Sequence, residues 1–285
     1  MGSDESMLEL NVTNLVLNEL RFDVPSRYGN WHFERLPAYP QQVDSLGAGQ
    51  CANTYFAQNS GLSSASDTLD IEGGIYELLD ICLVLSFVTA KCVTPSGSTP
   101  RSDLAFLSLP QHFLPPRSIV GFRALDCPNG IETLFRNFLS WPQSFADFSI
   151  RLFLSLWVSG LTAFTLEDIF IRTAVNMDIV KQSEIRLLGR DFRYYPGMEA
   201  ASKRFAIPPL SPDYKNMRND LLHEGRLSGS KYANKSKTEV ATTIAEVLNW
   251  IDLYISSALN LGGDVTVGAR WKAAELEHGL PSLSL

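Results

Sequence analysis

The stretch SPDYKNMRNDLLHEG, residues 211–225, predicts a short helix with clear ends. A serine can cap its start, the following proline suits the first helical position, and the final glycine suits the residue after a helix. Longer helical patterns lie on both sides of this segment. We therefore expect the C-terminal half of the chain to be a helical domain that includes this short helix.

The flanking patterns extend the helical prediction over most of the C-terminal half. Residues 143–159 are apolar on most sides, and 165–188 open with a threonine cap and two acids that favour a helix N-terminus. One apolar stripe runs along 238–260. Shorter helices are expected at 131–140 and around 272–278.

The N-terminal half has a different pattern. Partial alternation of apolar residues over 8–24 predicts strand, with helix as an alternative in the middle. Residues 25–70 are rich in Pro, Gly, Ser, Asn and Gln and predict loops with short strands. Residues 71–91 are apolar nearly all round and predict a central helix. Residues 104–128 give mixed strand and loop signals.

These patterns predict a mainly α protein with an N-terminal α+β region. The expected parts are an α+β region at 1–125, a helical domain at 130–262 and a tail at 263–285. A chain of 285 residues with 45% hydrophobic content can bury a sizeable core.

The net charge of −7 argues against broad binding to duplex nucleic acid, which needs a basic surface. It leaves room for a local basic groove, because many of the basic residues fall in one C-terminal stretch. They are Lys181, Arg186, Arg190, Arg193, Lys203, Arg204, Lys215, Arg218 and Arg226.

The four cysteines show no CxxC spacing and no nearby histidine, so neither a zinc site nor another cofactor is predicted. Cys82, inside an apolar helix, is interpreted as a buried structural thiol. The apolar runs 75–93 and 148–164 carry charges, and the second is also short, so we expect core helices and no membrane contact. The start of the chain has no signal-peptide pattern, which favours a reduced, cytoplasmic setting.

Arg218 and His223 carry the clearest chemical signal. Arginine can hold a phosphate in a fixed fork, and histidine can move protons near neutral pH. Asn219 and His223 share a helix face at i and i+4, whereas Arg218 lies about 140° around the helix from His223 and needs its long side chain to reach the same groove. Leu221 and Leu222 are expected to dock the helix.

A simpler interpretation of the same residues remains open. Arg218 would then lie on an exposed helix face and pair with a nearby acid. His223 would be placed at the helix C-terminus, where the dipole favours a cation.

The motif Arg218-Asn219-Asp220-Leu221-Leu222-His223, on a short helix between longer ones, resembles the HEPN superfamily, the higher-eukaryote and prokaryote nucleotide-binding domains. The resemblance covers about 130–262 and implies an up-down helical bundle. Its long helices would be 143–159, 164–188 and 238–260. With an irregular N-terminal part before the bundle, the chain is most similar to the Apea-like HEPN proteins of bacterial phage defence.

The resemblance implies a metal-independent endoribonuclease in which the RNA 2′-hydroxyl attacks and leaves a 2′,3′-cyclic phosphate. His223 would act as general base or acid, Arg218 would hold the scissile phosphate, and Asn219 would fix orientation. Asp178 would be the acid that faces the site and sets the histidine tautomer. The family also implies a homodimer, and a toxin or anti-phage defence effector held in check by a regulatory partner or antitoxin.

Five further residues are candidate RNA contacts: Arg190, Arg193, Tyr194, Lys203 and Arg204. They could stack on and pair with single-stranded RNA. A solvated loop with one aromatic packed down is the alternative. The alternative for the whole domain is a non-catalytic HEPN-like module for protein interaction or nucleotide binding.

Overall fold

The computed structural model describes residues 7–47, 49–96 and 124–285. The chain divides into two compact units, each described here by itself. Unit 1 comprises the described residues up to 96 together with 127–142, and unit 2 comprises 124–126 and 143–285. This division differs from the expected parts, because 131–140 belongs with the N-terminal unit and the expected tail belongs with the helices.

Unit 1 is built on a five-stranded antiparallel sheet with strand order β2-β3-β4-β1-β5. The strands are β1 (Met7–Thr13), β2 (Arg21–Ser26), β3 (Gly29–Arg35), β4 (Asn53–Ser63) and β5 (Thr94–Ser96). The other elements of the unit are α1 (Tyr39–Gly47), α2 (Thr68–Thr89), α3 (Ile131–Leu134) and the 3₁₀ helix η2 (Phe135–Ser140). The prediction of an N-terminal α+β region is confirmed.

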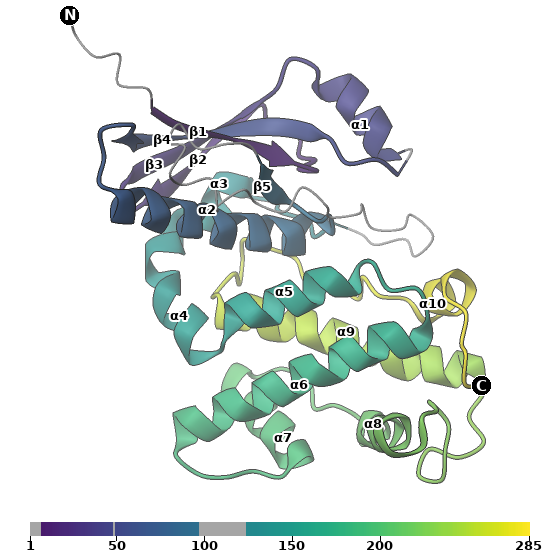
Figure 1. Ribbon diagram of the computed structural model, residues 1–285. Helices are drawn as coiled ribbons and strands as arrows, with labels where there is room; N and C mark the ends of the chain where they lie inside the picture. Colours follow the sequence, from purple (N-terminus) through teal and green to yellow (C-terminus); the bar gives the residue numbers. More distant parts are fainter. Residues whose placement is uncertain (1–6, 48, 97–123) are drawn as a thin grey trace, which may run out of the picture. The chain divides into compact units, whose positions relative to one another are not determined.

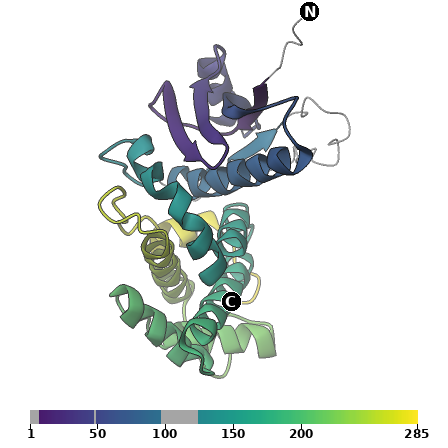
Figure 2. The same cartoon turned by 90° about the vertical axis from the view of Figure 1, so that its left-hand side faces the viewer.

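Helix α2 lies across one face of this sheet (Figures 1 and 2). Asp67 caps it by accepting a hydrogen bond from the Leu69 amide at 2.8 Å. A Cβ added at Gly74 would lie 2.3 Å from a Leu62 methyl group, so helix and sheet approach closely at this glycine. The predicted central helix is confirmed, and Cys82 is buried in it as expected.

The prediction of loops for residues 25–70 is wrong in part. This segment contains β4, an eleven-residue strand, and helix α1. The inward positions of β4 include the polar residues Thr54 and Asn59, both fully buried, so its alternation does not show as apolar against polar. Residues 104–123, where mixed strand and loop were expected, lie outside the described residues.

Unit 2 is helical. Its helices are α5 (Ile150–Gly160), α6 (Leu166–Leu188), α7 (Tyr194–Phe205), α8 (Asp213–Glu224), α9 (Lys237–Ala258) and α10 (Ala273–Gly279), while α4 (Trp141–Asp147) begins in unit 1. Helices α5 and α6 pack together, and α9 packs against α6, α7, α8 and α10 (Figure 1). Among the described residues, no helix has the length and apolar character needed to cross a membrane.

The ends of the long helices confirm the local signals. The Thr165 hydroxyl accepts a hydrogen bond from the Asp168 amide at 3.0 Å and caps α6.

The single helix expected at 143–159 is instead two helices, since Ser149 takes a left-handed conformation at φ 52° between α4 and α5.

One segment expected to be irregular is an ordered part of unit 2. Helix α7 was not predicted, because Pro196 and Gly197 are typical of turns. Proline is tolerated in the first helical turn, and Gly197 lies against Lys181 of α6, where a Cβ would lie 3.0 Å from the lysine Cγ.

The short helix expected around 272–278 is present as α10, and the C-terminal segment that contains it is bound to α9. Arg270 is buried and donates to the buried Asp252 of α9 at 2.6 Å, and Trp271 donates its indole N–H to the same carboxylate at 2.9 Å. This ion pair between Arg270 and Asp252 fixes the C-terminal segment to α9.

Candidate active site

Helix α8 presents the motif on its outer side. Tyr214, Met217, Asp220 and Leu221 are buried, while Arg218 and Asn219 are half-buried and Lys215, Leu222 and His223 are exposed. The expected docking role is therefore confirmed for Leu221 and wrong for Leu222, which is 52% exposed. The helix ends as predicted at Gly225, which takes a left-handed conformation at φ 73°.

Two neighbouring helices hold Arg218 in place. Its Nη2 donates to Asp178 Oδ2 of α6 at 2.9 Å, and its guanidinium carbon lies 4.2 Å from the ring centre of Tyr194 on α7. The Arg218 side chain is 19% exposed, against 44% for Asp178. The buried Nε has no hydrogen-bond partner among the described residues. The guanidinium is thus fixed in position, with its Nε enclosed by protein.

The support beneath Arg218 is a cluster of three tyrosine rings. The Tyr194 and Tyr195 rings lie 5.7 and 6.2 Å from the ring of the buried Tyr214, centre to centre. Burial raises the pKa of the Tyr194 phenol above its ordinary value, so the ring remains neutral near pH 7. A neutral aromatic face attracts a guanidinium and leaves its planar edge available.

His223 lies in the last turn of α8 and is exposed. Within the part of the chain that the structure describes, its imidazole makes no hydrogen bond or ion pair, and the same holds for the Asn219 amide group. Asp178 contacts Arg218 and not His223. The structure therefore brings Arg218 and Asp178 together, and does not place Asp178 where it could set the histidine tautomer.

The simpler interpretation of Arg218, as a residue on an exposed helix face, agrees with this geometry in one respect and differs in another. The arginine does pair with an acid, as that interpretation expects. It is, however, mostly buried and stacked on Tyr194, whereas a solvated face residue would be exposed.

Two acids of α8 organise the loop that follows it, and the sequence did not identify either. The Asp220 carboxylate, 1% exposed, accepts hydrogen bonds from the backbone amides of Gly229, Lys231 and Tyr232 at 2.9, 3.1 and 2.6 Å. Glu224 accepts from the Ser230 amide at 3.1 Å, and the Ser230 bonds hold the pKa of this carboxyl below its usual range. The turn that carries His223 is therefore tied on both sides to the loop.

The predicted RNA contacts are scattered. Arg204 donates to the fully buried Glu184 at 2.8 and 3.0 Å, so its charge neutralises that carboxylate. Arg193 is exposed at the start of α7, beside the tyrosine that supports Arg218. Lys203 is exposed in the last turn of α7, and Arg190 lies over the Phe192 ring at 4.8 Å. Of these five residues, Tyr194 is the one whose side chain contacts Arg218 in the described part of the chain.

No group of three or more His, Cys, Asp or Glu side chains within residues 7–47, 49–96 and 124–285 is arranged to hold a metal ion.

A scan of protein-family models, a search of curated proteins and a search of solved structures each give no significant match to the chain. The local chemistry of α8 is thus the main guide to function.

Proposed function

We propose that the chain is a metal-independent endoribonuclease of HEPN type. The observation that carries this proposal is the fixed guanidinium of Arg218 on α8, which stacks on Tyr194 and contacts Asp178 of α6. The same helix α8 exposes His223. A phosphate requires a positioned cation, and cleavage by the RNA 2′-hydroxyl requires a proton carrier. Both side-chain types lie within one and a half turns of helix.

Arg218 would bind the scissile phosphate and stabilise the charge that develops on its oxygens. Asp178 would act as a positioning residue, because its bond to Nη2 sets the plane of the guanidinium. His223 would take the proton from the 2′-hydroxyl or give one to the leaving 5′-oxygen. Asn219, between the two on the exposed side of α8, would orient the phosphate.

The same proposal assigns the helices of unit 2 to positions in a HEPN bundle. Helices α5, α6 and α9 would be the long helices of an up-down HEPN bundle, with α8 as its motif helix. The proposed biological role is a toxin or anti-phage defence effector, for which unit 1 would sense the trigger or restrain the activity.

A homodimer would supply a second histidine, so that one could act as base and the other as acid. Support comes from exposed apolar residues on the Asp178 side of α6. Ile171 and Val175, each 44% exposed, are spaced i and i+4, and Asp178 follows at i+7. We propose that two copies pack along this stripe and bring the two Arg218 sites to one cleft.

Replacing Val175 by aspartate is expected to convert the dimer to a monomer and to lower RNA cleavage at least tenfold, because a charge would be buried unpaired at the interface. Sedimentation equilibrium gives the mass, and a cleavage assay gives the rate. Leu188→Asp is the matched control, since Leu188 is equally exposed on α6 but lies on another face. A dimer that survives Val175→Asp with full activity would contradict the proposed interface.

The test of the activity is cleavage of single-stranded RNA by the purified protein in excess EDTA. We expect products that end in a 2′,3′-cyclic phosphate and a 5′-hydroxyl, with a rate about a hundredfold lower for Arg218→Ala. Arg136→Ala, an exposed arginine of unit 1, is the control and should retain the rate.

Saturable RNA binding without cleavage would favour the second candidate, a non-catalytic HEPN-like module for protein interaction or nucleotide binding. The net charge of −7 and the scattered basic residues are the observations on its side. Cleavage that EDTA abolishes would contradict the proposed activity.

A further inference from the structure

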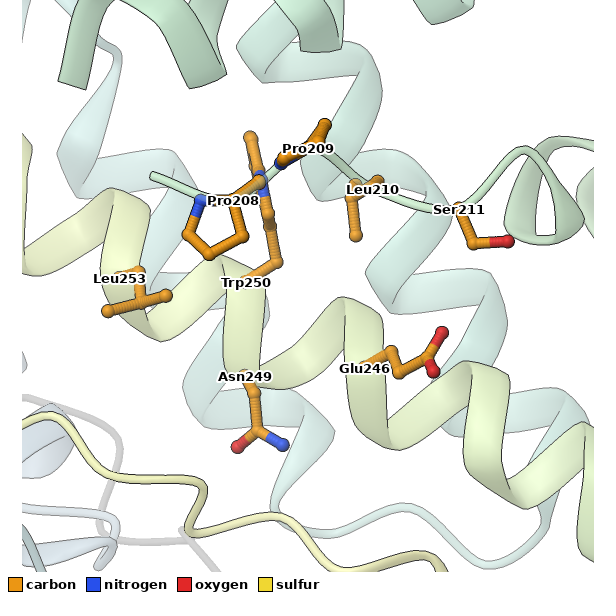
Figure 3. Close-up of a pocket in the computed structure, with 8 residues that line it drawn as sticks. All are labelled: Pro208, Pro209, Leu210, Ser211, Glu246, Asn249, Trp250 and Leu253. Atoms are coloured by element: carbon orange, nitrogen blue, oxygen red, sulfur yellow. The ribbon is translucent and has the colours of Figure 1, made fainter. Parts of the chain in front are cut away.

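Unit 2 contains a pocket of about 600 Å³ that is separate from the Arg218 site (Figure 3). One wall is the connector between α7 and α8, residues 208–211, and the other is the exposed side of α9. The volume is in the range of pockets that hold small ligands, which are usually 300–1,000 Å³.

The apolar wall of this pocket is held rigidly. Pro208, Pro209, Leu210 and Leu253 supply aliphatic surface, and the Trp250 ring stands beside Pro208 (Figure 3). The indole N–H of Trp250 donates to the Pro208 carbonyl oxygen at 2.9 Å, which fixes the ring against the connector. The Tyr195 hydroxyl donates a hydrogen bond to the Leu210 carbonyl oxygen at 2.8 Å and holds the connector at a second point. The wall is therefore formed before any ligand arrives.

The polar groups of the lining carry one sign of charge. Glu246 is the only titratable residue among the lining residues, and it extends from α9 toward the connector (Figure 3). Among the described residues, no hydrogen bond or ion pair engages its carboxylate. Burial and the neighbouring Asp213 raise the pKa of Glu246 above its ordinary value.

The amide side chain in the lining, that of Asn249, already has hydrogen-bond partners. Asn249 donates to the Trp271 carbonyl oxygen at 2.9 Å and accepts from the Trp271 amide at 3.0 Å. Ser211 accepts from the Asp213 amide at 3.2 Å and keeps its hydroxyl proton. The strongest polar interaction open to an occupant is therefore an ion pair with Glu246.

We propose that this pocket binds a small amphipathic amine, with its apolar body against Pro208, Leu210 and Trp250 and its ammonium group at Glu246. The combination of a preformed apolar wall and one carboxylate without a partner selects a cation over an anion of the same shape. The proposal concerns a second site and does not depend on the ribonuclease activity.

The test compares three indole compounds of similar shape and different charge: tryptamine, which is a cation, tryptophol, which is neutral, and indole-3-acetate, which is an anion. Each is titrated into the full-length ¹⁵N-labelled protein, and the Trp250 indole N–H and the Leu210 and Ser211 amides are followed by NMR. Tryptamine is expected to give saturable shifts at these signals, with about fivefold weaker binding for tryptophol, as for one partly exposed ion pair, and none for indole-3-acetate.

Glu246→Gln should remove the preference for tryptamine over tryptophol, whereas Glu199→Gln, an exposed acid outside the pocket lining, should leave it unchanged. Equal affinity for the three compounds would overturn the proposal. So would shifts confined to other residues, no saturable shift by tryptamine, or a preference that survives Glu246→Gln.

Discussion

Replacing His223 by alanine should lower the rate of RNA cleavage about 10²–10⁴-fold, the usual contribution of a general acid or base. The side chain is exposed and makes no hydrogen bond or ion pair within the part of the chain that the structure describes, so stability should not change. The measurement is the single-turnover rate on a labelled RNA, with far-ultraviolet circular dichroism to check the fold.

His278→Ala is the matched control, because His278 is also an exposed histidine near the end of a helix in unit 2. This variant should cleave at the wild-type rate. Equal rates for His223→Ala and wild type would remove His223 from the mechanism.

Replacing Asp252 by alanine should lower the free energy of unfolding by about 3–5 kcal/mol, because it leaves a buried arginine without its counter-charge. Asp252 is fully buried and accepts from Arg270 at 2.6 and 3.1 Å, from Trp157 at 3.0 Å and from Trp271 at 2.9 Å. Since Arg270 and Trp271 belong to the C-terminal segment, the loss should release that segment from α9.

Urea denaturation of both proteins measures this change, and limited proteolysis shows whether the C-terminal segment is freed. Lys272→Ala, an exposed neighbour of the cluster, should change the free energy of unfolding by less than about 0.5 kcal/mol. An Asp252→Ala protein as stable as wild type would show that the cluster contributes no net stability.

The elements that the sequence predicted well are those with local signals. Helix α2 is apolar nearly all round, α6 has its Thr165 cap, and α8 ends at Gly225. The features that it missed depend on distant partners. Helix α7 forms because Gly197 lets it approach Lys181 of α6, and the C-terminal segment is bound to α9 because Arg270 reaches Asp252.

The candidate site shows the same limit. Arg218 and His223 are five positions apart in the sequence and could be identified from their chemistry and spacing. The family resemblance named Asp178, forty residues away, as the acid of the site, but its bond to Arg218 was not predicted because the expected contact was with His223. Likewise, the bond of Arg204 to the buried Glu184 spans twenty residues and was not predicted. Residue type predicts what a side chain can do, whereas its partner decides whether it is available.

The most direct test of the central claim is cleavage, in excess EDTA, of an RNA oligonucleotide that carries a single 2′-deoxynucleotide at the mapped cleavage position. The proposed mechanism needs the neighbouring 2′-hydroxyl as nucleophile, so the all-ribose strand should be cut there and the substituted strand should not. Equal cleavage of both strands, or a product with a 5′-phosphate, would contradict the mechanism assigned to Arg218 and His223.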